Sequence, residues 1–113
     1  MKRHFELEAS LRESPNPLTA PPDWTHAEVA TVNDAVVLHA GGGRLQGEWH
    51  RQDSDEVLVV LRGELRVDFD DEHISVGPGQ GVFIRAHERH RTEVPEDALL
   101  LSVEATHMQR LEP

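Results

Sequence analysis

Three side chains that can bind a metal ion or exchange a proton stand just ahead of the most apolar run of the chain. They are His50, Gln52 and Glu56, in the stretch GEWHRQDSDEVLVVLRGE (47–64). Successive side chains of a strand point to opposite faces, so His50 and Gln52 share one face and lie roughly 6 to 7 Å apart along it. Glu56 follows a turn, and antiparallel pairing would bring its carboxylate back beside them. The spacing therefore predicts a polar cluster on one face of a strand pair.

A fourth donor is expected from the stretch GPGQGVFIRAHERHR (77–91). Pro78 and Gly79 are typical turn residues, and a short apolar strand follows them. His87 and His90 come after this strand, and each is a candidate for the fourth position. The chain has no cysteine, so any metal ion must be held by histidine, carboxylate or amide groups.

Short strand-like runs that would position these residues begin at Glu28. They are separated by Gly, Pro, Asn and Asp, and no stretch between them has helical periodicity. A series of short strands without intervening helices predicts an all-β antiparallel sandwich or barrel. We predict nine strands, at 28–32, 35–40, 44–51, 56–61, 64–69, 73–76, 81–85, 90–94 and 98–105. Asn33 and Asp34 predict a tight hairpin between the first two.

The N-terminal part of the chain has a different composition. Two leucines four residues apart in FELEASLRES (5–14) predict a short helix. The four prolines of SPNPLTAPPDW (14–24) then predict an extended connector. We expect residues 1–27 to form a helix and an arm that pack on a barrel of residues 28–113, with Trp24 as the anchor of the arm.

Composition narrows the classes of function. The chain has 113 residues, which fits one domain, and a formal net charge of −10. It lacks the basic surface that binds nucleic acid or an anionic membrane. Its first residues are too acidic for a signal peptide, and no apolar run approaches the roughly 20 residues that span a bilayer. We therefore expect a cytoplasmic protein that binds a small molecule, with neither nucleic acid nor a membrane as a partner.

Two of the predicted strands are apolar on both faces. They lie in EVLVVLR (56–62) and ALLLSV (98–103). Both faces of such a strand need cover, and an uncovered face is an aggregation hazard. The N-terminal arm or a second subunit would supply the cover, and the recurrence of the pattern favours a homodimer.

The first polar stretch resembles the first sequence motif of the cupins. That motif runs histidine-x-histidine, three or four residues, glutamate, six residues, glycine. HRQDSDEVLVVLRG matches it at His50, Glu56 and Gly63, with Gln52 in place of the second histidine. The resemblance implies a double-stranded β-helix, also called a jelly-roll barrel.

The second polar stretch resembles the second cupin motif, which has a proline-glycine turn, a short strand and a histidine. GPGQGVFIRAHERH matches it at Pro78 and Gly79. The distance from the turn favours His90 over His87 as the motif histidine. The two motifs together resemble those of small bacterial cupins labelled as mannose-6-phosphate-isomerase-like, over about residues 28–105.

Carried over to this chain, the resemblance implies a metal site. His50, Glu56 and His90 would bind one divalent ion inside the barrel, with Gln52 at the remaining position. Two nitrogens and two oxygens suit iron(II), manganese, zinc, nickel or copper. An amide oxygen is neutral and a poorer donor than imidazole, so we expect weaker metal retention than in a four-ligand cupin. Gln52 would either bind the ion or orient a water or substrate.

Two functions fit these features. One is a metal-binding cupin that binds or transforms a small polar metabolite in its barrel, where isomerase or dioxygenase chemistry would be compatible. The other is a non-catalytic barrel that binds or senses a small molecule, with a structural metal or none. The chain lacks the lysine-rich phosphate site expected of a true sugar-phosphate isomerase. One fold carries many chemistries, so the motifs do not select a reaction.

Two further residues remain open at this stage. His39, within the predicted strand 35–40, faces either the cavity or water. Arg85, beside the second motif, either binds an anionic substrate or is a solvated residue at a strand end, and the second role is the one we expect.

Overall fold

The computed structural model describes residues 3–112, so residues 1, 2 and 113 of the expected arm and barrel lie outside it. It contains one short helix and ten strands within that range. In chain order they are α1 (Leu7–Glu13), β1 (Leu18–Ala20), β2 (Trp24–Val32), β3 (Val36–Gln46), β4 (Arg51–Gln52), β5 (Glu56–Arg62), β6 (Leu65–Phe69), β7 (His73–Val76), β8 (Gly81–Ile84), β9 (His90–Ala105) and β10 (Arg110–Leu111).

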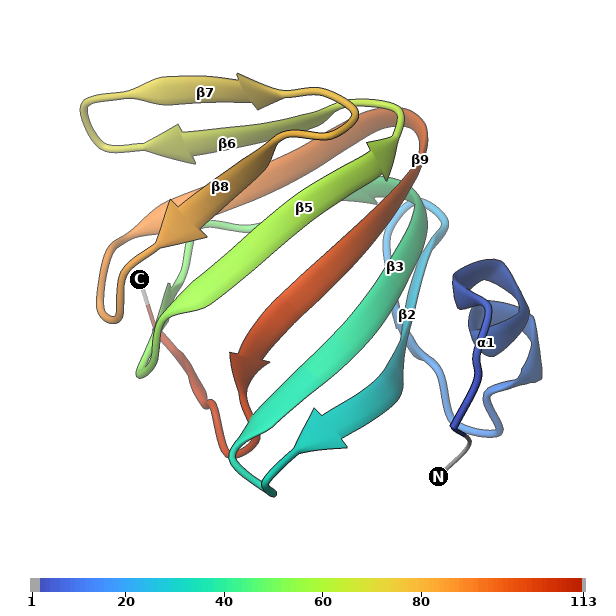
Figure 1. Ribbon diagram of the computed structural model, residues 1–113. Coiled ribbons are helices and arrows are strands. Elements are labelled where there is room, and N and C mark those ends of the chain that lie inside the picture. Colours follow the sequence, from blue (N-terminus) through green and yellow to red (C-terminus); the bar gives the residue numbers. More distant parts are fainter. Residues whose placement is uncertain (1–2, 113) are drawn as a thin grey trace.

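Most strands belong to one antiparallel sheet that curls over on itself (Figure 1). Neighbours run in the order β1, β2, β3, β9, β5 and β8, while β6 pairs with both β7 and β9. The first part of β9 pairs with β6, and its second part lies between β3 and β5. This strand therefore belongs to both layers, and the predicted all-β jelly-roll barrel is confirmed.

The long strand β9 differs from the prediction of two strands, at 90–94 and 98–105. The backbone stays extended through Pro95, which is possible because the fixed φ of proline is compatible with extended structure. The partner strands adjust here, with register shifts between Gly43 and Leu45 in β3 and between Val60 and Arg62 in β5. One strand thus runs from the site histidine at 90 to the far side of the barrel.

The turn between β2 and β3 is the predicted tight hairpin. Asn33 and Asp34 have φ angles of 53° and 52°, and the backbone N–H of Ala35 donates to the carbonyl of Val32 at 3.0 Å. These positive φ angles are typical of a type I′ turn, whose twist matches that of the flanking strands.

Steric constraints explain why the first motif has a glycine at position 63. Gly63 has a φ of +87°, and a Cβ at this position would lie 2.6 Å from the Cβ of Ala98. A side chain would therefore meet both backbone strain and a clash with β9. Gly63 allows the chain to turn closely past β9 between β5 and β6.

The N-terminal helix packs on the outer side of β2 and β3 (Figure 1). The Cδ1 of Leu11 would lie 2.9 Å from a Cβ at Gly42, so this glycine lets the helix approach the sheet. Strand β1 and the start of β2 precede residue 28, so the sheet includes residues that we assigned to the arm. Trp24 is 7% exposed and belongs to the core.

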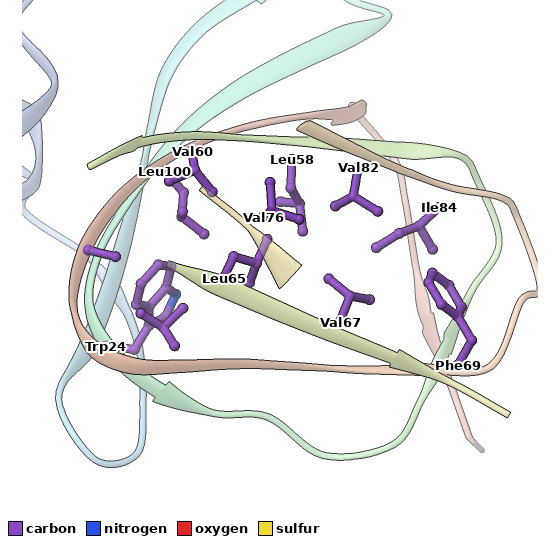
Figure 2. Packing of buried hydrophobic residues seen from close by; sticks show 12 residues of the cluster. Trp24, Leu58, Val60, Leu65, Val67, Phe69, Val76, Val82, Ile84 and Leu100 are labelled. Carbon is purple, nitrogen blue, oxygen red and sulfur yellow. The ribbon is translucent and has the colours of Figure 1, made fainter. Parts of the chain in front are cut away.

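Apolar side chains fill one part of the space between the layers (Figure 2). Some of them also border the cavity described below, so the core and the cavity share a wall. No helix within residues 3–112 is long and apolar enough to cross a membrane. The labelled core residues are Trp24, Leu58, Val60, Leu65, Val67, Phe69, Val76, Val82, Ile84 and Leu100.

Candidate metal and ligand site

A cavity of about 650 Å³ opens inside the barrel. All four residues predicted for the metal site line it, together with His39. His87 and Arg85 are exposed and are not part of the lining. The four residues that line it are His50, Gln52, Glu56 and His90.

The two site histidines are joined by a backbone bridge. The N–H of His50 donates to the carbonyl of His90 at 2.9 Å, and the N–H of His90 donates to the carbonyl of His50 at 3.0 Å. The centroids of the two imidazole rings are 4.3 Å apart. Antiparallel pairing thus brings together two histidines that are distant in sequence.

Both imidazole rings are held in the same way. The Nδ1 of His50 lies 2.9 Å from the carbonyl oxygen of Glu48, and the Nδ1 of His90 lies 2.8 Å from that of Glu88. A carbonyl oxygen only accepts, so each Nδ1 carries the hydrogen and the Nε2 of the neutral ring keeps its lone pair. Metal-binding histidines usually have their second nitrogen held in this manner.

The free nitrogens of the rings lack ordinary partners. The Nε2 of His90 is buried and has no hydrogen-bond partner among the described residues. The Nε2 of His50 lies 3.2 Å from the Oε1 of Gln52, and both of these atoms are acceptors when the ring is neutral with its hydrogen on Nδ1. Burial lowers the pKa of His90, which favours the neutral form that a metal ligand needs.

Gln52 lies between His50 and Glu56. It is 5% exposed, and its Nε2 donates to the Oε1 of Glu56 at 3.3 Å. Its backbone carbonyl accepts the N–H of His87 at 2.7 Å, which ties down the loop before β9. The structure places His90, rather than His87, beside His50 and inside the cavity.

Glu56 belongs to a second polar cluster. It is the cross-strand partner of Glu104, and the Oγ of Ser102 donates to its Oε2 at 3.2 Å. Burial and the nearby Glu104 raise the pKa of Glu56 to about 7. Burial alone would raise the pKa of Glu104, but hydrogen bonds from His39 and Glu56 lower it. A proton shared by the two carboxyl groups therefore resides on Glu56.

Sequence reasoning missed Glu104 and left His39 open. The Nδ1 of His39 lies 3.2 Å from the Oε1 of Glu104, and the ring of His26 meets that of His39 edge-on at 5.4 Å. The sequence did contain a signal for Glu104 as a cavity residue. Side chains alternate along a strand, so Ser102 and Glu104 lie on the same face as the inward Leu100.

Few side chains in the cavity are placed to bind a metal ion. Within residues 3–112, no group of three or more His, Asp or Glu residues could hold a metal ion. The site has two imidazoles, and its next donor is the amide of Gln52, through which Glu56 is connected to His50. Two nitrogens and an oxygen still fit a borderline transition-metal ion, and the predicted four-residue set stays a prediction.

A family model for the cupin domain matches residues 34–104, which is more than half of the chain. The chain belongs to the cupin family. The first cupin motif contributes His50, Gln52, Glu56 and Leu58 to the cavity lining, and the second contributes His90. Among curated proteins, none is similar enough in sequence to match this cupin.

Solved structures agree with this assignment. A cupin-2 domain protein of Shewanella frigidimarina has 25% identity and a TM-score of 0.67, covering 71% of this chain and 78% of its own. The polyketide cyclase RemF of Streptomyces resistomycificus has 18% identity and a TM-score of 0.78, covering 99% and 85%. A Ralstonia eutropha protein named provisionally as a mannose-6-phosphate isomerase has 18% identity and a TM-score of 0.71, covering 92% and 98%.

These similarities establish the fold of the cupin and leave its reaction open. The RemF and Ralstonia relatives share the barrel at low identity, and their names refer to different chemistries. Function must therefore be argued from the side chains of this cavity.

Proposed function

We propose that this cupin binds one divalent transition metal in its barrel and binds or transforms a small polar metabolite beside it. His50 and His90 would hold the ion, and Gln52 and Glu56 are the remaining candidate ligands. The observation that carries the proposal is the pair of fixed imidazoles, each with its Nδ1 on a backbone carbonyl and its Nε2 without an ordinary donor. A buried nitrogen without a partner is costly, and a cation would satisfy it.

The chemistry of the donors suits iron(II), manganese, zinc, nickel or copper. When bound, such an ion supplies Lewis acidity to an oxygen of the ligand. The backbone carbonyls of Glu48 and Glu88 keep the two rings oriented. Without a metal ion, Glu56 has a pKa of about 7 and can hold or release a proton at its carboxyl group near neutral pH, as a general acid or base must.

Metal content tests the proposal. Elemental analysis of protein purified without chelator should find close to one transition metal per chain. His50→Ala should lose the metal and keep the fold, because a partly exposed strand-end residue is not part of the core. His87→Asn is the matched control, since His87 is exposed, and the asparagine tolerates its φ of 67°. Metal retained in His50→Ala, or lost in His87→Asn, would show that the ligands are assigned wrongly.

The second candidate function is a binding or sensing barrel without catalysis. It is favoured by the small donor set, in which no three His, Asp or Glu residues of the described chain could hold a metal. A protein that takes up no iron, manganese, nickel or zinc but still binds a ligand in the cavity would support this candidate over the first.

A further inference from the structure

The cavity is lined by acidic groups and by histidines, with almost no arginine or lysine. Among the described residues that line it, Glu48, Glu56 and Glu104 are acidic, and Arg110 is the one arginine or lysine. The side chain of Arg110 is 57% exposed, and its Nη2 lies 3.7 Å from the Oε2 of Glu48. Arg110 is therefore paired with Glu48 at the rim of the cavity, and its positive charge does not lie in the interior.

Among the described residues, the interior carboxyl groups have no cationic partner other than histidine. Glu56 contacts Gln52, Ser102 and Glu104, and Glu104 also contacts His39. A phosphate or carboxylate that entered the cavity would lose its hydration and approach the carboxylate of Glu104, and that of Glu56 when it is ionised, without an arginine or lysine nearby. Like charges in a site of low dielectric repel strongly.

A bound metal does not give the cavity an excess of positive charge. Its histidine ligands are neutral, and Glu56 and Glu104 together can carry as much negative charge as a divalent ion carries positive charge. The formal charge of −10 on the whole chain also repels anions before they reach the cavity. A cationic ligand has little to gain either, because it would have to compete with His39 for the carboxyl group of Glu104 and a bound metal would oppose it.

The remaining lining is mainly apolar. Burial of apolar ligand surface supplies most of the affinity in such a pocket, while a few polar groups orient the ligand. Gln52, Ser102 and His39 can exchange hydrogen bonds with hydroxyl or carbonyl oxygens. The apolar side chains on this wall include Trp24, Leu45, Leu58, Leu65, Leu100 and Met108.

We propose that the ligand of this cavity is an uncharged molecule with an apolar body and hydroxyl or carbonyl oxygens, and that Glu104 helps to reject anions. This inference rests on the proposed function only in taking the cavity as the ligand site, and it does not require the metal. An uncharged ligand would distinguish this cupin from a protein that binds a phosphorylated sugar.

Fluorescence of Trp24 provides the test. Trp24 lines the cavity, whereas Trp49 lies against Arg89 and Arg91 outside it. In the Trp49→Phe protein, Trp24 is the only tryptophan. The Trp49→Phe protein is titrated in its zinc-loaded form and in its metal-free form. The four ligands each contain one aromatic ring and differ in charge: benzyl alcohol, benzylamine, benzoate and phenyl phosphate. Benzyl alcohol should bind about tenfold more tightly than either anion.

Three results would overturn the inference. They are anions that bind as tightly as benzyl alcohol, benzylamine that binds more tightly than benzyl alcohol, and no response to benzyl alcohol at millimolar concentration. The metal analysis is independent of these titrations. A protein without metal that still prefers benzyl alcohol disproves the metal site alone, and a metal-loaded protein that prefers benzoate disproves the charge class alone.

A variant tests the part assigned to Glu104. Glu104→Gln in the Trp49→Phe background should tighten benzoate binding by about tenfold, while benzyl alcohol binding stays within about twofold. Glu93→Gln is the matched control, because Glu93 is on the same strand and pairs with Arg66 away from the cavity. Unchanged benzoate binding in Glu104→Gln contradicts this role. The titrations with Glu104 intact decide the ligand class if the variant does not fold.

Discussion

Gln52 is the residue at which this cupin departs from its family motif, and its place in the structure gives the departure a physical meaning. It separates the imidazole of His50 from the carboxyl group of Glu56, contacting one through its oxygen and the other through its nitrogen. A histidine here would add a third nitrogen donor directly beside the first two.

Gln52→His should therefore raise the affinity for zinc by about tenfold or more, because imidazole is a better donor than an amide oxygen for a borderline ion. The affinity is measured by competition with a chromophoric chelator. His73→Gln is the control, since the side chain of His73 is 82% exposed and is not part of the cavity lining. Equal affinity in wild type and Gln52→His would mean that position 52 does not face the ion.

The pKa of Glu56 predicts a pH-dependent stability of the metal-free protein. Its value of about 7 in the folded state lies above the ordinary 4.5, so the folded state loses stability as the pH rises from about 4.5 to about 7. Below that window the carboxyl group is neutral in both states. Glu56→Gln should be more stable than wild type at pH 8 by up to about 3 kcal/mol, and equal to it near pH 4.

Urea unfolding at the two pH values measures this difference. The amide of the variant keeps a donor for Glu104, so the hydrogen bond is retained. Glu93→Gln, at a surface ion pair, should show no such pH dependence. A variant that is less stable than wild type at pH 8 would mean that the ionised Glu56 has a partner strong enough to offset its burial.

At the scale of elements, strand β9 organises the interior. It begins with His90 at the proposed metal and carries Ser102 and Glu104 at the other polar cluster. The turn at Gly63 fits closely against Ala98 of this strand and connects β5 and β6, which both pair with β9.

Gly63→Ala should destabilise the fold by about 2 to 4 kcal/mol, because it adds a clash with Ala98 to the strain of a positive φ. Gly79→Ala separates the two effects. Gly79 has a φ of +80°, but nothing lies within 4 Å of a Cβ there, so it should cost only about 1 kcal/mol. Guanidinium unfolding gives both values, and equal losses would exclude the clash with Ala98 as a cause.

At the scale of the whole molecule, an apolar face of the sheet is left open. The side chains of Phe83 and Leu61 are 54% and 43% exposed, and Val57 is the cross-strand partner of Phe83. Helix α1 packs on the same sheet over β2 and β3, and its Glu8 also pairs with Arg62 at the end of β5 (Figure 1). The homodimer that the two-sided strands suggest stays a prediction, as does the cytoplasmic location.

Phe83→Glu should turn that dimer into a monomer, since a charge at the centre of an apolar contact is costly to bury. Sedimentation velocity measures the mass of each species in solution. Val32→Glu is the control, because Val32 is 50% exposed but lies at the β2–β3 hairpin. A monomeric wild type, or equal dissociation by Val32→Glu, would contradict this interface.

The sequence by itself determined what depends on near neighbours along the chain. Strand alternation placed His50 and Gln52 on one side, and turn chemistry located the hairpin at Asn33 and Asp34. Both follow from local backbone geometry, which a few residues decide. The jelly-roll barrel was implied by the resemblance to the cupin motifs.

Only the tertiary structure decided which distant side chains meet. The register of β5 against β9 puts Glu104 opposite Glu56, and the pairing of β3 with β9 brings His39 to the same carboxyl group. A shift of one residue would turn each of these side chains to the other face. That register is set by the packing of the whole sheet, which no short stretch of sequence contains.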